Sequence, residues 1–460
     1  MNIKKNIARV FSANFLQLMT SIIVGFYVPA VLSIEGYADL RTYTLYITYV
    51  GFTHFGFIDG MYIKYGGKDP DKIEAGALKA EHRVFCVQQI LITMVALGIG
   101  LVLKEPLWIL LGLSIIPINA YSFHRMFYQA TGQFKLYTKY AYLYTGCYFA
   151  FNVFLAILLK TDNQWLYCLA NLGSNVVVFL LLEMAFRRKM QHISAQYDHK
   201  ELWNHVKVGI YILIGNLAVN MFYSIDQWFV KGALTDTDFA FYAFSVSLLS
   251  LVNVLINAIS VTFYNFLAQG VEKYKIAEIK TGLILLGTMG SGAFFALSAI
   301  VHLLLPKYIP SLEIVAISFM AIPYMMVINA LYVNLYKVEK NEKLYLREVV
   351  RMLIVATGLN ALALLLISGV QGIAMATTIS FVLWFLYATR HFSYLKVTNK
   401  ELVYLLFSGT LFLLCSHYFN WFLGVLIYCG RDTFVGIGLY KDMLKKWIEQ
   451  ILTKKKEIVE

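Results

Sequence analysis

The chain has 460 residues, of which 59% are hydrophobic and only 14% are charged, and its formal net charge is +12. A soluble domain carries about a quarter charged residues, which cover its surface. So few charges exclude a water-soluble globular protein of this length. We therefore predict an all-α polytopic membrane protein whose solvent is the lipid bilayer.

The first apolar run covers residues 8–32 and follows the basic residues Lys4, Lys5 and Arg9. A helix of about 25 residues is long enough to cross roughly 30 Å of hydrocarbon. A cleaved signal peptide has a shorter apolar core. We predict that this run is retained as the first transmembrane helix.

Apolar runs of membrane length recur along the chain between short polar breaks. The connections between them are about twenty residues at most, which leaves no room for a folded domain outside the membrane. We predict fourteen transmembrane spans, at 8–32, 41–61, 84–103, 107–129, 140–160, 165–186, 207–230, 239–266, 281–305, 312–335, 351–369, 370–390, 402–417 and 419–440.

Lysine and arginine are distributed unevenly between alternate connections. Of the 39 basic residues, 32 fall in the N-terminus, in every second connection and in the C-terminal tail. Basic residues mark the cytoplasmic side of a membrane protein, so we predict cytoplasmic N- and C-termini. This requires a turn near residues 417–420 that separates the last two spans. Anionic headgroups explain the basic excess, and we expect no nucleic-acid partner.

Two similar segments suggest an internal repeat. Residues 135–139 (KLYTK) precede the fifth span, and residues 343–347 (KLYLR) precede the eleventh. An offset of six spans is typical of transporters built from two related halves, whereas chance similarity between apolar segments is the alternative. We predict a six-helix lobe, a cytoplasmic linker, a second six-helix lobe, two additional helices and a basic cytoplasmic tail, at residues 1–186, 187–206, 207–392, 393–440 and 441–460, respectively.

Five groups of residues carry a resemblance to a known family. They are Asn14 with Pro29, residues 56–66 (GFIDGMYIKYG), residues 125–135 (RMFYQATGQFK), Asp226, and residues 372–376 (GIAMA). Through these motifs and its helix count, the chain resembles the Wzx-type oligosaccharide flippases of O-antigen, capsular and exopolysaccharide synthesis. That family belongs to the MOP (MATE-like) exporter superfamily, and the likeness covers roughly residues 8–392.

The resemblance implies two pseudo-symmetric lobes that form a V around a central cavity. It implies alternating access that moves undecaprenyl-pyrophosphate-linked oligosaccharide repeat units from the cytoplasmic to the outer leaflet. The expected location is the bacterial cytoplasmic (inner) membrane. Coupling to a H⁺ or Na⁺ gradient is implied, with no other cofactor, and a polysaccharide polymerase and glycosyltransferases are the implied partners.

Four side chains inside or near the predicted spans are candidate substrate-binding groups: Arg125, His124, Arg41 and His54. The negative charges of a pyrophosphate need donors within hydrocarbon, and ionisable residues in spans suggest function. The arginine fork suits phosphate oxygens, and histidine can donate or titrate. The alternatives are arginines that extend to the membrane interface and histidines that are hydrogen-bonded within the helix packing.

Three amides, Asn14, Gln17 and Asn216, are further candidates for binding the substrate. Asn14 and Gln17 share one helical face because they are three residues apart. These amides can hydrogen-bond sugar hydroxyls in a cavity, or they can hold neighbouring helices together. The sequence does not decide between the two.

Two carboxylates, Asp59 and Asp226, are candidates for ion coupling. A carboxylate that faces a cavity within the membrane can bind a cation or a proton. The alternatives are that Asp59 caps a helix or pairs with Lys64, and that Asp226 pairs with Lys231. For Glu183, an ion pair with Arg187 one helical turn later is the favoured interpretation.

Two other functions compete with the flippase. One is a small-molecule or drug exporter of the same superfamily, and the other is a membrane enzyme such as a polysaccharide polymerase or ligase. We predict no enzyme, no catalytic residue and no metal site, because the sequence shows no metal-ligand or nucleophile motif. All five cysteines lie in apolar segments, where they are expected to pack between helices.

Overall fold

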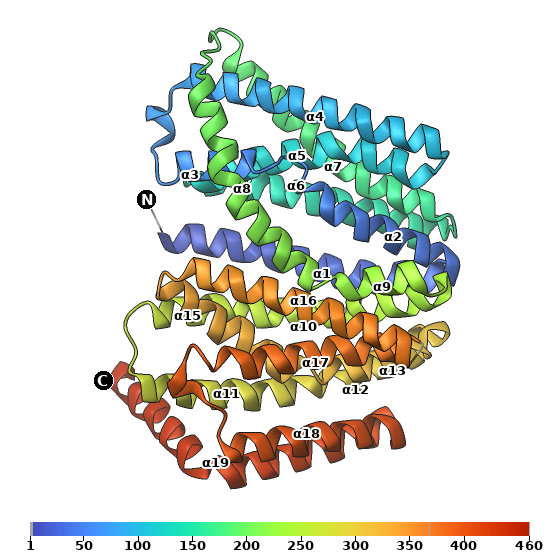
Figure 1. Ribbon diagram of the computed structural model, residues 1–460, viewed down its shortest axis with the longest axis vertical. Coiled ribbons are helices and arrows are strands. Elements are labelled where there is room, and N and C mark those ends of the chain that lie inside the picture. Colours follow the sequence, from blue (N-terminus) through green and yellow to red (C-terminus); the bar gives the residue numbers. More distant parts are fainter. Residues whose placement is uncertain (1–2, 368, 460) are drawn as a thin grey trace. The chain divides into compact units, whose positions relative to one another are not determined.

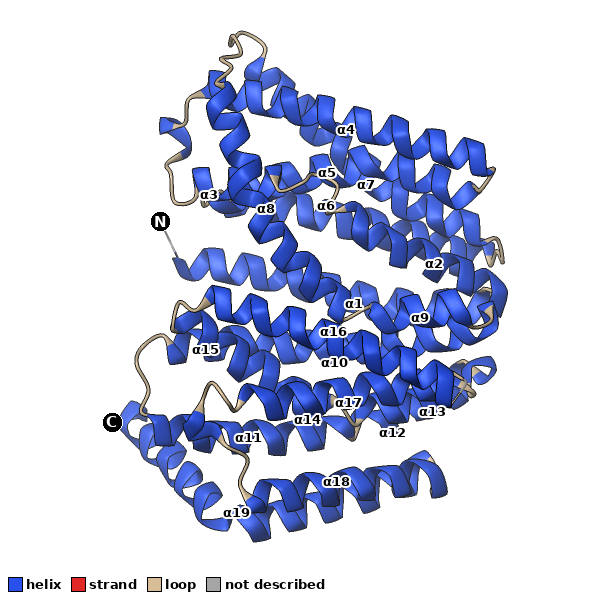
Figure 2. Cartoon of the chain, viewed as in Figure 1, coloured by secondary structure: helices blue, strands red, loops and turns tan. Residues whose placement is uncertain are grey.

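The chain consists of helices joined by short turns. The computed structural model describes residues 3–367 and 369–459, and these residues contain no β-strand (Figure 2). They form two compact units, Met1–Ser224 and Ile225–Glu460. The all-helical fold class that the composition predicts is therefore confirmed.

The first unit contains eight labelled helices, most of them long enough to cross a membrane (Figure 1). Short 3₁₀ and π-helical turns lie at Pro70–Lys72 and Phe154–Leu159. The main packing pairs are α4 with α5, α5 with α7, α1 with α6, and α3 with α8. The helices are α1 (Ile3–Val31), α2 (Ile34–Val50), α3 (Phe57–Tyr65), α4 (Ala75–Leu103), α5 (Pro106–Ala130), α6 (Phe134–Val153), α7 (Gln164–Met190) and α8 (His199–Phe222).

The second unit is also built of packed helices, but more of its helices are broken. Its main packing pairs are α11 with α14, α10 with α13, α16 with α17, and α18 with α19. Short 3₁₀ and π-helical turns lie at Pro306–Tyr308, Ile328–Tyr332 and Ser393–Leu395. The helices are α9 (Ile225–Ala233), α10 (Asp236–Leu267), α11 (Lys273–Ser291), α12 (Ala293–Leu304), α13 (Ser311–Phe319), α14 (Ile322–Val327), α15 (Val333–Val338), α16 (Glu342–Leu366), α17 (Val370–Ala388), α18 (Asn399–Tyr418) and α19 (Trp421–Val459).

The number of membrane-length helices is close to the prediction. In the described residues, twelve helices are long and apolar enough to span a membrane, and a thirteenth span results if one bent pair is counted. The missing fourteenth corresponds to the predicted span 41–61, which is not continuous. Helix α2 ends at Val50, and α3 begins at Phe57 after a turn.

Glycine explains this break and the packing that follows it. Gly56 has a left-handed backbone (φ +82°), and a Cβ atom there would lie 2.4 Å from the backbone nitrogen of Ile210. A Cβ atom on Gly60 would lie 2.1 Å from the carbonyl oxygen of His205. Glycine has no Cβ atom, so it tolerates both the left-handed backbone and the close approach of another helix. The motif of residues 56–60 therefore lets α3 approach the backbone of α8.

The predicted span 207–230 is also wrong as a single helix. Helix α8 ends at Phe222, and α9 begins at Ile225. The Ser224 hydroxyl donates to the carbonyl of Asn220 at 2.8 Å, and the Asp226 carboxylate accepts the N–H of Gln227. Such local side-chain bonds compete with helix continuation.

Proline bends the predicted span 312–335. The helices Ser311–Phe319 and Ile322–Val338 meet at 46°. Pro323 has no N–H to donate to the carbonyl of Phe319, four residues earlier. The hydroxyl of Ser291 on α11 donates to that carbonyl instead, at 2.9 Å.

The connection near residues 187–206 is shorter than predicted, and the one near residues 417–420 lies where it was predicted. Helix α7 continues to Met190 and α8 begins at His199, so much of the predicted linker 187–206 is helical. Helix α8 packs with α3 inside the first unit. The separation of the last two spans is confirmed, because α18 and α19 are divided at residues 419–420. Helix α19 has a non-helical residue at Tyr440, directly before the predicted tail 441–460.

Candidate functional site

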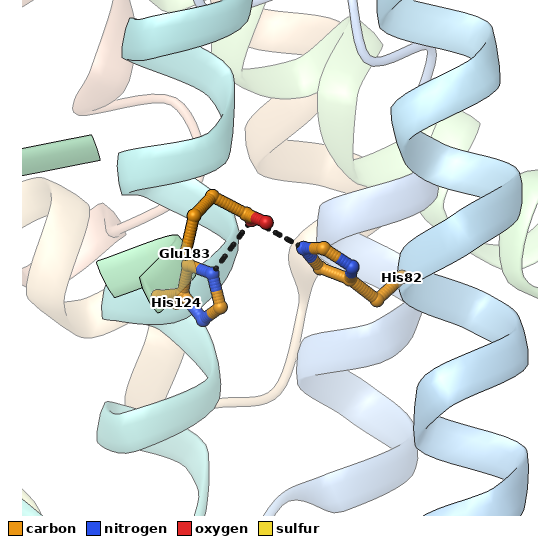
Figure 3. Close-up of side chains that lie close together, drawn as sticks. All are labelled: His82, His124 and Glu183. Atoms are coloured by element: carbon orange, nitrogen blue, oxygen red, sulfur yellow. Dashed lines mark hydrogen bonds and ion pairs between the residues drawn. The ribbon is translucent and has the colours of Figure 1, made fainter. Parts of the chain in front are cut away.

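Three buried side chains from three different helices meet in the first unit. His82 on α4, His124 on α5 and Glu183 on α7 are 6%, 1% and 6% exposed. The Nε2 atoms of His82 and His124 lie 2.7 and 3.4 Å from the same carboxylate oxygen, Oε1 of Glu183 (Figure 3). The other oxygen, Oε2, lies 3.4 Å from Nε of Arg187, which confirms the predicted helical ion pair.

A second buried cluster is centred on Glu81, the residue that precedes His82 on α4. Its Oε1 atom accepts from Lys64 Nζ at 2.5 Å and lies 3.1 Å from Nε2 of His205. Its Oε2 atom accepts the Tyr65 hydroxyl at 3.0 Å. Lys64 also pairs with Glu201 at 2.9 Å. This network ties α3 and α4 to α8 and fully satisfies a buried carboxylate, as a stable interior requires.

His54 and Asp59 are brought together by the turn between α2 and α3. Nδ1 of the buried His54 accepts the N–H of Gly56 at 3.1 Å, and its Nε2 lies 3.8 Å from Oδ2 of Asp59. The alternative in which Asp59 pairs with Lys64 is wrong, because the partners of Lys64 are glutamates. The two predicted residues therefore form one polar pair.

Arg125 and His124 are neighbours in sequence but face different partners. His124 is buried against Glu183, whereas Arg125 is exposed on α5. The Arg125 Nη2 atom donates to the Tyr137 hydroxyl at 3.0 Å, and its guanidinium carbon lies 5.2 Å from the centre of that ring. Arg41 on α2 is partly buried, and its Nε atom is buried without a hydrogen-bond partner.

The three predicted amides are exposed on the first unit. Asn14 and Gln17 lie on α1, and Asn216 lies on α8. They join Arg125 as polar or charged groups that the unit does not bury. A polar side chain in a spanning helix is costly against lipid tails. Their exposure is therefore a feature that the function has to explain.

Asp226 is a buried carboxylate of the second unit, 5% exposed in the first turn of α9. Its Oδ2 atom accepts the Tyr242 hydroxyl at 2.7 Å and the Thr377 hydroxyl at 3.3 Å. Among the described residues, its hydrogen-bond partners are all neutral donors. The predicted alternative, a pair with Lys231, is wrong, because Lys231 pairs with Asp236 at 2.5 Å.

Two further buried ionic groups in the second unit were not predicted from the sequence. Lys280 Nζ lies 2.8 Å from Oε2 of Glu401, and both side chains are 2% exposed. The buried Glu348 lies 3.0 Å from Arg351 and 3.3 Å from His391. Lys280 and Glu401 are 121 residues apart, and no local spacing in one sequence signals such a pair.

Arg431 and Asp432 are neighbours on α19 but differ in how far they are buried. Asp432 is completely buried and accepts hydrogen bonds from the hydroxyls of Tyr404, at 2.9 Å, and Ser408. Arg431 is exposed. The carboxylate of Asp432 therefore ties α19 to α18.

Comparison with known proteins gives a match in structure. No family model and no curated protein sequence matches the chain. The lipid II flippase MurJ, in an inward closed conformation, has a TM-score of 0.73 at 12% identity, covering 95% of this chain and 99% of that one. An inward-facing MATE-family multidrug resistance transporter of the MOP superfamily has a TM-score of 0.55 at 14% identity, covering 86% and 99%.

A MOP-superfamily transporter from Pyrococcus furiosus has a TM-score of 0.50 at 13% identity, covering 86% of this chain and 97% of that one. These likenesses show that the chain has the MOP/MATE-like fold, as the sequence resemblance implies. With its twelve or thirteen membrane-length helices in the described residues, the chain is a multi-pass membrane protein.

Proposed function

We propose that this chain is a flippase of surface-polysaccharide synthesis. It moves undecaprenyl-pyrophosphate-linked oligosaccharide units from the cytoplasmic to the outer leaflet of a bacterial inner membrane by alternating access. The observation that carries the proposal is the near-complete mutual coverage with a lipid II flippase, at a TM-score of 0.73. The two transporters with lower TM-scores cover only 86% of this chain.

The exposed polar groups of the first unit support a substrate that is itself polar. Arg125, Asn14, Gln17 and Asn216 lie on helices of membrane length and are not buried. A guanidinium binds phosphate oxygens through a fork of N–H donors, and amides hydrogen-bond sugar hydroxyls. In this proposal Arg125 contacts the pyrophosphate, and the amides contact the glycan.

Asp226 supports coupling to a cation gradient. A buried carboxylate surrounded by neutral donors has no counter-charge of its own, and burying such a charge unpaired is costly. Binding of Na⁺ or H⁺ at Asp226 removes that cost. Occupation of this site in one conformation and release in another would link ion movement to substrate movement. Asp59, which faces His54, is the second candidate for this role.

The test is a deletion of the gene in its host, complemented with variants present at equal levels in the membrane. We expect Asp226→Ala and Arg125→Ala to abolish surface polysaccharide and to leave lipid-linked repeat units on the cytoplasmic leaflet. The control is Asp236→Ala, which changes the exposed partner of Lys231 and should complement fully. Full complementation by both site variants would refute these site assignments.

The same experiment separates the competing functions. Loss of a polymerase or ligase would leave single repeat units on the outer leaflet, after transport. Loss of a drug exporter would leave the surface glycan unchanged and raise sensitivity to toxic cations. Only accumulation of repeat units on the cytoplasmic leaflet agrees with the flippase.

A further inference from the structure

The His82–His124–Glu183 cluster is not used by the proposed transport function. Its three ligand atoms all lie within 4.8 Å of one another, and all three residues are buried. We propose that this cluster binds one transition-metal cation of the zinc class. The site joins α4, α5 and α7, and the proposal does not depend on what the protein transports.

The distances are close to those of a tetrahedral site. Two ligand atoms, each about 2.05 Å from a tetrahedral ion, lie about 3.3 Å apart. Nε2 of His124 already lies 3.4 Å from Oε1 of Glu183. The corresponding distance for His82 is 2.7 Å, which is a hydrogen bond that must lengthen by about 0.6 Å. All three ligand atoms lie within 4.8 Å of one another, so binding needs the His82 ring to move away from Oε1 and the two histidine ligand atoms to reach a separation of about 3.3 Å.

Cys86 is the candidate for a fourth ligand, but its side chain has to move to bind, because its Sγ atom is not among the ligand atoms that all lie within 4.8 Å of one another. It follows His82 by four residues on α4, so the two side chains lie on the same face of that helix. The Cys86 Sγ atom lies 3.7 Å from Nε2 of His82. That distance is near the separation of about 3.6 Å between a nitrogen and a sulfur ligand of one zinc ion. With Cys86 moved towards the ion, the set would be two imidazoles, one carboxylate and one thiolate; without it, the set is two imidazoles and one carboxylate.

The donors and their surroundings favour a borderline metal ion over calcium or magnesium. Imidazole and thiolate ligands are typical of zinc, whereas calcium and magnesium require mainly oxygen ligands. The rings of Phe123 and Phe186 lie 5.3 and 4.3 Å from the His82 ring, so apolar groups line the cluster. Such a lining excludes water and strengthens metal–ligand attraction.

The cluster lies at the same level on all three helices. His82 is seven residues after the start of α4, and His124 and Glu183 are six and seven residues before the ends of α5 and α7. These ends correspond to the predicted cytoplasmic side, about 10 Å away at 1.5 Å per residue. A bound ion would cross-link the three helices there. Single-sequence spacing does not reveal the site, because its ligands come from separate helices.

The experiment uses the purified full-length chain, carrying no histidine tag, in detergent after chelation and desalting. Co²⁺ serves as a spectroscopic probe, and Zn²⁺ bound per chain is measured by mass spectrometry. We expect one equivalent of either ion, and the visible bands of tetrahedral Co²⁺ that Zn²⁺ abolishes. His82→Gln, His124→Gln and Glu183→Gln should each weaken binding tenfold or more, since loss of outer-shell groups alone costs about 10- to 100-fold.

Two further variants make the result specific. Cys86→Ser should retain Co²⁺ but lose the thiolate-to-cobalt absorption. His205→Gln removes another buried histidine of the same unit, one that contacts Glu81, and should bind as the wild type does. The proposal is overturned if the wild-type chain retains no metal above a protein-free control, or if His205→Gln weakens binding as much as His82→Gln. Because the wild-type stoichiometry decides first, a ligand variant that does not fold leaves the test intact.

Discussion

Replacing Lys280 by Met should strongly destabilise the second unit. Nζ of Lys280 lies 2.8 Å from Oε2 of Glu401 and donates to the backbone carbonyls of Leu395 and Lys396 at 3.0 Å. Both charged side chains are almost fully buried. Lys280→Met keeps most of the volume but leaves the carboxylate of Glu401 without its counter-charge.

The expected loss follows from the contacts that remain. Removing one partner of a buried ion pair costs about 3–5 kcal/mol, because the other charge stays buried and uncompensated. Glu401 would still accept the Thr281 hydroxyl and the N–H of Thr398, each at 2.9 Å. We therefore expect a loss at the lower end of that range, about 3 kcal/mol of the unfolding free energy. Adding Glu401→Gln to Lys280→Met should recover a large part of this loss.

The assay is unfolding of the purified chain by SDS titration in mixed micelles. Lys275→Met is the matched control, since Lys275 lies on the same helix and its pair with Glu272 is half exposed. Surface ion pairs contribute little, so the control should unfold like the wild type. If Lys280→Met were no less stable than Lys275→Met, the inference that a buried ion pair anchors α18 to α11 would be wrong.

Three further variants test the helix packing, the substrate site and the topology. Gly60→Ala should lower the unfolding free energy by about 2–3 kcal/mol, because the new Cβ atom would meet the backbone of His205. The control Gly98→Ala on α4 has open space around it and should raise the unfolding free energy by about 0.5–1 kcal/mol. Equal thermal shifts in the two variants would contradict the close approach of α3 and α8. Arg125→Lys should retain membrane levels but bind a pyrophosphate-linked glycan more weakly, measured by ligand-induced thermal shift, because an ammonium lacks the guanidinium fork; an unchanged shift would remove Arg125 from the binding site. An epitope inserted at the exposed His192, between α7 and α8, should be accessible only from the cytoplasm; external labelling would reverse the proposed topology.

Much of the fold could be predicted from the sequence because hydrocarbon thickness fixes the length of an apolar helix. The positive-inside pattern also predicted the turn that separates α18 from α19, which the structure confirms. The breaks after Val50 and Phe222 were missed because they lie within apolar runs, where hydropathy does not change. There, glycine conformation and local hydrogen bonds decide where a helix ends.

The candidate sites were only partly predictable for a related reason. An ionisable residue inside a span can be recognised from one sequence, so Asp226, His54 and His124 were found. The partners of Asp226 and His124 could not be predicted, because they lie on other helices and depend on how these are rotated against one another. The pairing of His54 with Asp59 depends on the turn between α2 and α3, which the hydropathy pattern did not show. Glu183 lies 101 residues from His82, and only the packing of α4 against α5 and of α5 against α7 brings the two together.

The central claim is that the chain moves a lipid-linked oligosaccharide across a bilayer. The most direct measurement uses liposomes that contain the purified chain and an undecaprenyl-pyrophosphate-linked oligosaccharide with a fluorescent sugar, to which a membrane-impermeant quencher is added. We expect nearly all of the fluorescence to become quenchable in the presence of a Na⁺ or H⁺ gradient, whereas protein-free liposomes keep their inner-leaflet fraction protected. A protected fraction equal to that of protein-free liposomes, under either gradient, would contradict the central claim.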